Sequence, residues 1–344
     1  MRVDQRPCFV EVVQHLVYAV LKGEIPPDIT PHRRNKASSI MPYLGLRGTQ
    51  LNIAVGFIAS IGFLLFGYDQ GVMGALLTLP SFVKQFPAIN AVSYPGEDPA
   101  VLNHKSTLQG ATVGLYEIGC MSGALSVLYV GDKLGRRWTI FCGGAIMIVG
   151  AVIQCSSFSL AQLIVGRLVT GGGNGLLTST VPIWQSECSK PHMRGKLVMI
   201  EGAMITFGIM ISYWVDFGFY AGSNASKGGD SSSVVWRFPI GLQIIFGIIL
   251  CSFVLVLPES PRWLMKKGRR AEAERVLAAL EGTGNTELVK SDLAEITASL
   301  REEGHSLRAL ITMGKDKHLH RTILAFVNQV FQQISGINLV GQAR

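Results

Sequence analysis

Asp69 and Arg167 are the ionisable residues whose placement most clearly suggests chemistry, because each interrupts a long apolar run. Asp69 lies in the run 51–77, and Arg167 lies in the run 160–183. At 1.5 Å per residue, Asp69 lies about 12 Å before the end of its run, and Arg167 lies about 10 Å after the start of its run. Opposite charges at one depth relieve each other's burial cost. They can form a static ion pair, or the Asp69 carboxyl can gain and release a proton when its spacing from Arg167 changes.

Side-chain amides form a second group, in the last apolar run at 322–342. Gln332 lies ten residues into this run, about 15 Å from its start and near the midplane of a bilayer. Gln333 and Asn338 follow it. An amide both donates and accepts hydrogen bonds, which suits the hydroxyl groups of a sugar. The alternative is that these amides bond one helix to another.

Charged residues between the apolar runs form a third group. The candidates for a network of ion pairs are Asp132, Arg136, Arg137, Glu187, Arg194, Glu259 and Arg262. Glycines at 131 and 135 allow the chain to reverse, and Asp132 can pair with basic groups at a helix end. The alternative is that all these residues are solvated loop charges.

The elements that position these groups are seven apolar runs of about 20 residues or more. They cover 51–77, 107–130, 138–158, 160–183, 197–219, 238–257 and 322–342. Twenty apolar residues in a helix cross about 30 Å of hydrocarbon. The chain has 344 residues, of which 48% are hydrophobic and only 16% are charged. These values argue against an ordinary soluble enzyme and predict an all-α membrane protein.

Basic residues concentrate on alternate sides of the runs, in the segment 1–50, in the loops near 131–137 and 184–196, and in the segment 258–321. This uneven distribution predicts a cytoplasmic N-terminus, and it explains the net charge of +8 without binding to nucleic acid. Asn224 begins an Asn-Ala-Ser sequon in an outer loop, so it is a candidate for glycosylation. Apolar residues at helical spacing predict short helices in 269–280 and 286–301.

Patterns typical of an enzyme or a metal site are missing from the sequence. The six cysteines form no pair with the spacing of a zinc site, and the histidines lie in tails and loops. Glycines at 171–173 and 175 are not preceded by a strand, so they do not predict a dinucleotide loop. They instead predict close approach of neighbouring helices. We expect no cofactor, no metal ion and no enzymatic activity.

Five motifs, in order along residues 51–340, make the chain resemble the sugar porter family of the major facilitator superfamily. The motifs are FGYDQGV at 66–72, GDKLGRR at 131–137, RLVTGGGNG at 167–175 with PIWQSE at 182–187 and RG at 194–195, PESPRWL at 258–264, and QQISGIN at 332–338. The Trp184-Gln185-Ser186-Glu187 variant is similar to fungal proton symporters of sugars and polyols. One position departs from the pattern, because Gly202 stands where relatives often carry a sugar-binding glutamine.

The resemblance implies a fold and a function. The fold is a six-helix lobe at 51–257 after a cytoplasmic segment at 1–50, then linker helices at 258–321 and part of a seventh membrane helix at 322–344. The function is transport of a sugar or polyol across the plasma membrane by a monomer, by alternating access. Asp69 and Arg167 would couple transport to protons, whereas Gln332, Gln333 and Asn338 would contact the substrate. The charged network would latch the cytoplasmic face.

The length of the chain departs from the family, whose members have twelve membrane helices in two lobes. The chain stops in the seventh helix, so the resemblance implies a C-terminal truncation and makes transport by this chain alone doubtful. Two alternatives follow, namely a nutrient sensor that does not transport and an inactive fragment of a transporter.

Overall fold

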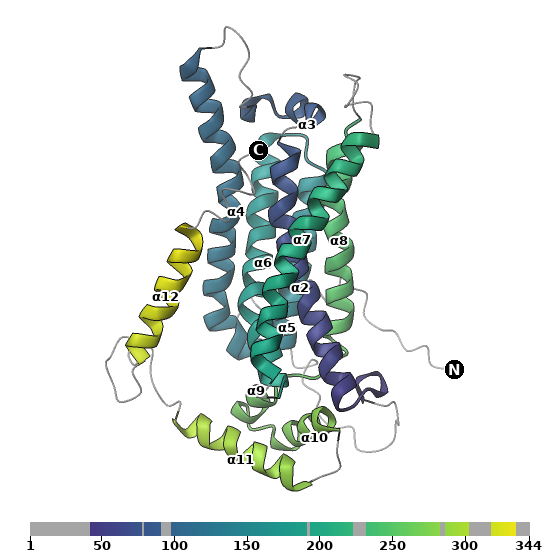
Figure 1. Ribbon diagram of the computed structural model, residues 1–344, viewed down its shortest axis with the longest axis vertical. Helices are drawn as coiled ribbons and strands as arrows, with labels where there is room; N and C mark the ends of the chain where they lie inside the picture. The colour runs from purple at the N-terminus through teal and green to yellow at the C-terminus, as the bar shows by residue number, and fades with distance from the viewer. Residues whose placement is uncertain are drawn as a thin grey trace.

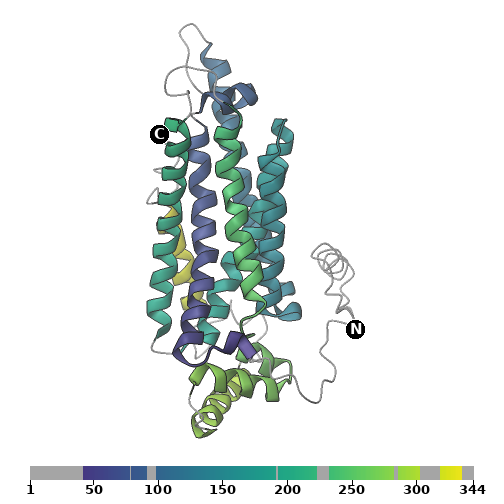
Figure 2. The ribbon, with the colours of Figure 1, turned by 90° about the vertical axis from the view of Figure 1, so that its right-hand side faces the viewer.

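Six long helices run side by side and form the body of the protein (Figures 1 and 2). This computed structural model describes residues 42–77, 79–90, 98–190, 193–222, 232–282, 286–302 and 318–334, and these residues contain no β-strand. The six helices are α2 (Thr49–Leu76), α4 (Pro99–Leu134), α5 (Arg136–Cys155), α6 (Leu160–Cys188), α7 (Arg194–Gly222) and α8 (Val234–Val254). The expectation of an all-α fold is confirmed.

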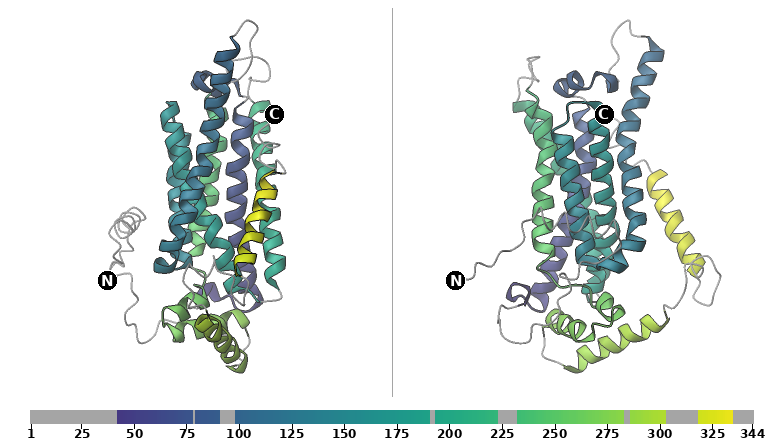
Figure 3. Two further views of the ribbon diagram at one scale, coloured as in Figure 1. Left: turned by 90° about the vertical axis from the view of Figure 1, so that its left-hand side faces the viewer. Right: turned by 180° about the vertical axis from the view of Figure 1, so that it is seen from behind.

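Shorter elements lie at the two ends of this bundle. At one end are α3 (Pro80–Gln85) and η3 (Pro87–Ile89), and at the other, which we call the linker end, are η2 (Pro42–Gly45), α9 (Pro261–Lys266), α10 (Arg270–Glu281) and α11 (Thr286–Glu302). A last helix, α12 (His318–Ile334), lies beside the bundle (Figure 3). Helices were expected near the bounds of α10 and α11, and both are present.

Length and composition allow α2, α4, α5, α7 and α8 to cross a membrane. Helix α6 is 29 residues long but falls outside this set. Its sequence carries Arg167 together with several glycines and threonines, and these reduce its apolar content. It packs between α4 and α5, where such residues contact other helices. The five apolar helices agree with the predicted multi-pass membrane protein. Helix α6 is less apolar and is buried by its neighbours α4 and α5.

The connection between α4 and α5 is tighter than the expected loop at 131–137. Helix α4 continues to Leu134, and α5 begins at Arg136, so the turn consists of Gly135 alone. Gly135 has a φ of 89°, a conformation that a side chain disfavours. The glycine was correctly expected where the chain reverses, but α4 ends four residues later and α5 begins two residues earlier than the apolar runs suggested.

Glycines hold α4 and α6 close together, as the sequence predicted. A Cβ atom on Gly175 of α6 would lie 2.1 Å from the carbonyl oxygen of Cys120 on α4. A Cβ atom on Gly123 of α4 would likewise lie 2.2 Å from the carbonyl oxygen of Gly172. Only glycine allows two backbones to approach this closely, so these positions fix the spacing of the two helices.

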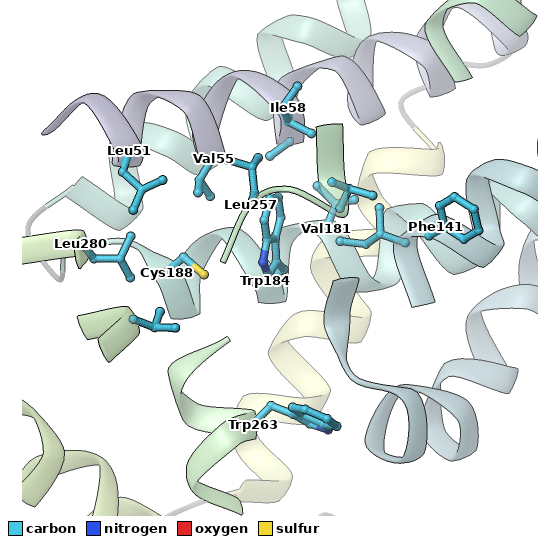
Figure 4. Packing of buried hydrophobic residues seen from close by; sticks show 14 of the residues in the cluster. Leu51, Val55, Ile58, Phe141, Val181, Trp184, Cys188, Leu257, Trp263 and Leu280 are labelled. Atoms are coloured by element: carbon cyan, nitrogen blue, oxygen red, sulfur yellow. The ribbon is translucent and has the colours of Figure 1, made fainter. Parts of the chain in front are cut away.

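The linker end is joined to the bundle by one apolar cluster. Leu51 and Val55 of α2 pack in it with Trp184 of α6 and Leu280 of α10 (Figure 4). The backbone N–H of Gly48 also donates to the carbonyl oxygen of Ala279 at 2.7 Å. This packing places α10 against the end of α2 and α9 against the end of α6, near the charged residues between the helices.

Candidate functional site

Asp69 and Arg167 meet in the interior of the bundle. Arg167 Nη1 lies 3.4 Å from Asp69 Oδ1, and the two side chains are 2% and 0% exposed. Asp69 comes from α2 and Arg167 from α6, which are 98 residues apart in the chain. The pair predicted from equal depth is therefore present, with one long contact rather than the two parallel bonds of a strong arginine–carboxylate pair.

Asn174 and Tyr116 complete the surroundings of this pair. Asn174 Nδ2 donates to Asp69 Oδ2 at 3.3 Å and to the Tyr116 hydroxyl at 2.9 Å. The Tyr116 hydroxyl also hydrogen-bonds the Asp69 side chain. The guanidinium of Arg167 lies over the Tyr116 ring, 4.5 Å from its centroid. The carboxylate thus has three neighbours that favour its negative charge, and the arginine has an aromatic face.

Two polar atoms of the site have no hydrogen-bond partner in the described structure. They are Arg167 Nε, a donor, and Asn174 Oδ1, an acceptor, and both are buried. An unpaired buried polar atom costs about 1–3 kcal/mol. Hydrogen bonding at the site is therefore incomplete among the described residues.

A second polar cluster lies at the linker end. Arg136 of α5 binds Glu187 of α6 through two bonds, Nε–Oε2 at 3.0 Å and Nη2–Oε1 at 3.1 Å. Asp132 lies 3.6 Å from Arg136 Nη1 and 2.6 Å from Lys266 Nζ. The indole N–H of Trp263 donates to the backbone carbonyl of Asp132 at 3.1 Å. These contacts join α4, α5, α6 and α9.

Glu259 lies at the N-terminus of α5. Its Oε1 accepts from the backbone N–H groups of Arg136 at 3.1 Å, Arg137 at 3.3 Å and Ser260 at 2.9 Å. The carboxylate thereby satisfies two amides that no helical carbonyl can reach. Burial nevertheless raises the pKa of Glu259, and this effect exceeds the opposite influence of the amides and of Arg137.

The guanidinium of Arg137 makes the complementary contact at a helix C-terminus. Its Nε donates to the carbonyl oxygen of Val254 at 3.2 Å, and its Nη2 donates to that of Leu255, at the end of α8. A cation at this position interacts favourably with the helix dipole. Glu259 and Arg137 together tie the start of α5 to the end of α8.

The other two predicted residues of the network are Arg194 and Arg262. Arg194 Nε donates to the carbonyl oxygen of Ser186 at 2.9 Å, so it bonds the backbone of α6 rather than a carboxylate. Arg262 lies in the first turn of α9 and is partly buried. The structure thus brings Asp132, Arg136, Arg137, Glu187 and Glu259 together, whereas Arg194 contacts the same helix at a different point.

Several predicted site residues cannot be placed. Asn338 and Asn224 lie outside the described residues. Gln332 and Gln333 lie in the last turn of α12, but their side chains are outside the described part of the structure. Among the described residues, no group of three or more His, Cys, Asp or Glu side chains is arranged to hold a metal ion.

Sequence reasoning missed Asn174, Tyr116 and Lys266 as members of these clusters. Asn174 follows Arg167 by seven residues, which places both on one face of a helix, so spacing offered a signal. Nothing in the sequence distinguished Tyr116 or Lys266 from other residues of their type. Two buried carboxyls on α7, those of Glu201 and Asp216, do not take part in the Asp69 cluster.

Comparison with known proteins agrees with this architecture. The family model described as "Sugar (and other) transporter" matches residues 55–341. The chain is 41% identical over 313 residues to the sugar transporter STL1 of Saccharomyces cerevisiae, covering 89% of this chain and 52% of STL1. It is 31% identical to the high glucose sensor RGT2 of the same yeast, covering 86% of this chain and 38% of RGT2. The chain thus spans about half the length of the curated relatives it matches.

The fold also matches solved structures. The xylose transporter XylE from E. coli, in a partially occluded inward open conformation, superposes with a TM-score of 0.68. The two are 24% identical, and the match covers 85% of this chain and 65% of XylE. At this identity the likeness establishes the arrangement of the helices.

Proposed function

The chain belongs to the sugar transporter family, and on that basis we propose that it takes part in moving a sugar or polyol across a membrane together with a proton. The observation that carries the proposal is the buried pair of Asp69 on α2 and Arg167 on α6. Ionisable residues at this depth are costly and usually mark a substrate or proton pathway, and a carboxylate there can take up and release a proton.

Asp69 is the proton carrier in this proposal, and Arg167 is the switch that controls it. While Arg167 Nη1 remains near Asp69, the carboxylate is favoured. Movement of α6 relative to α2 lengthens a contact that is already 3.4 Å, and the carboxyl then takes up a proton. Asn174 and Tyr116 hold the carboxyl in place in both states. Arg167 Nε and Asn174 Oδ1 are an unused donor and an unused acceptor, which are available for new hydrogen bonds when the helices move.

The cluster at the linker end is the latch in the proposed cycle. Arg136 and Glu187, with Asp132, Arg137 and Glu259, tie the helix ends to the linker when that face is closed.

Substrate contacts are proposed at Gln332, Gln333 and Asn338. The proposal also includes a cytoplasmic linker end, a plasma-membrane location, the domain bounds 1–50, 51–257, 258–321 and 322–344, and a monomer. Similarity to STL1 and XylE supports a sugar as the substrate class.

Uptake of radiolabelled sugars and glycerol tests the proposal, with the chain expressed in cells that lack their own carriers. We expect uptake that increases as the external medium is acidified, and loss of this pH dependence in Asp69→Asn. Asp98→Asn is the matched control, because Asp98 caps α4 at the exposed end and lies outside the cluster. Unchanged pH dependence in Asp69→Asn would exclude proton coupling through this residue.

A second candidate, a sensor that binds sugar without moving it, is favoured by the similarity to RGT2. Binding of radiolabelled sugar to the purified chain distinguishes the two functions. A sensor binds sugar but gives no uptake in carrier-deficient cells, whereas a transporter gives both.

A further inference from the structure

An apolar groove on the far side of α2 has no part in the clusters described above. It has a volume of about 850 Å³ and is lined by α2, α7, α8 and the connection that follows α6. Figure 2 shows α7 and α8 on either side of α2. Ser60 lines the groove, and Asp69 lies nine residues later, which is two and a half helical turns. The groove and Asp69 therefore face opposite sides of α2.

The wall of this α2–α7–α8 groove is apolar over most of its length. Ile53 and Phe57 of α2 line it and are 65% and 64% exposed. Met204 of α7 and Phe246 of α8 line the other sides. The groove belongs to helices that cross the membrane, where the surrounding solvent is lipid acyl chain.

Apart from Ser60, the polar and basic residues of the groove lining lie at its linker end. They are Thr49, Asn52, Ser189 and Lys190. Lys190 Nζ lies 2.8 Å from Glu281 Oε2, and its side chain remains 36% exposed, so it can bind a second anion. The buried Oδ1 of Asn52 has no partner in the described structure. The lining is thus amphipathic along its length, like a phospholipid.

The electrostatics of this end favour an anion. Helices α2 and α7 both begin here, and neither has an acidic residue in its first turn. Their N-terminal N–H groups and dipoles therefore add positive potential that no acidic side chain of their own first turns offsets. Arg194 and Lys196, both exposed in the first turn of α7, add two positive charges.

We propose that the α2–α7–α8 groove binds one anionic phospholipid, with its acyl chain along Ile53, Phe57 and Met204 and its headgroup at Lys190. A basic residue near a bilayer surface contributes a preference for anionic lipid of about five-fold. The proposal rests on the membrane-spanning helices and not on transport, so it holds or fails independently of the proposed function.

The test counts the lipid molecules that remain on the purified full chain after transfer from mixed phosphatidylserine and phosphatidylcholine vesicles, by native mass spectrometry. We expect one phosphatidylserine to be retained in preference to phosphatidylcholine. Gly56→Phe should abolish this retention, because a Cβ there lies 3.4 Å from a Leu197 methyl group and the ring extends into the groove. Gly114→Phe on α4, where a Cβ meets nothing within 4 Å, is the control and should retain the lipid.

Two variants that break the same ion pair test the headgroup. Lys190→Gln should reduce the preference for phosphatidylserine about five-fold, whereas Glu281→Gln should keep or increase it. Met204→Trp fills the groove from α7 and replaces Gly56→Phe if that variant does not fold. Unchanged retention of phosphatidylserine in the groove-filling variants would overturn the site. Occupation of the groove by a second copy of the chain would also overturn it. Equal effects of Lys190→Gln and Glu281→Gln would overturn the role of Lys190.

Discussion

Replacing Glu259 tests whether one carboxyl group organises the linker end. In Glu259→Ala, the backbone N–H groups of Arg136, Arg137 and Ser260 lose the oxygen that accepts from them. A donor left without its partner costs about 1–3 kcal/mol, and the lower value applies because Glu259 is only partly buried. Three donors therefore predict a loss of about 3 kcal/mol.

Glu259→Gln separates hydrogen bonding from charge. The amide oxygen of glutamine can take the place of Oε1 and keep all three bonds. Burial raises the pKa of Glu259, so the carboxylate is less favourable here than in water, and loss of its charge costs little. The one contact that is lost is that of Oε2 with the backbone N–H of Arg137 at 3.3 Å, because the glutamine NH₂ group replaces Oε2 and two donors then face each other. We expect a loss of about 1 kcal/mol.

Thermal unfolding of the purified chain in detergent measures these differences. At about 2–4 °C per kcal/mol, the midpoint should fall by about 6–12 °C in Glu259→Ala and by about 2–4 °C in Glu259→Gln. Glu287→Ala is the control, because Glu287 pairs with Lys290 at a side-chain exposure of 83% and should change the midpoint little. Equal falls in the two Glu259 variants would refute the reasoning, because charge rather than hydrogen bonding would then be decisive.

Two further predictions concern glycine packing and pH. Gly175→Ala should destabilise the chain by about 1–3 kcal/mol, because its Cβ would lie 2.1 Å from the Cys120 carbonyl oxygen. Gly172→Ala, three residues earlier with only one atom at 4.0 Å, should stabilise it by about 0.5–1 kcal/mol, and thermal midpoints compare the two. Because the pKa of Glu259 is raised in the folded state, its stabilising contribution is full below the ordinary glutamate value of 4.5 and is lost as pH rises through the folded value. The midpoint deficit of Glu259→Gln relative to the natural chain should therefore shrink from acidic to neutral pH, and a constant deficit would contradict the raised pKa.

Hydropathy and spacing were sufficient to predict the local features of this protein. Runs of about 20 apolar residues predicted the long helices, because crossing a bilayer requires an uninterrupted apolar length. The turn at Gly135 followed from a residue type that tolerates positive φ. Equal depth of Asp69 and Arg167 followed from a fixed rise per residue. Each of these inferences needs only the identity of nearby residues.

Contacts between distant segments could be decided only by the tertiary structure. Glu259 binds the backbone of Arg136, 123 residues away, although sequence reasoning expected it to pair with basic side chains. Asn174 and Tyr116 join Asp69 because glycines bring α4 and α6 to a spacing and rotation that no single helix encodes. Sequence periodicity determines which face of a helix is apolar, and the packing of whole helices determines which side chains on those faces meet.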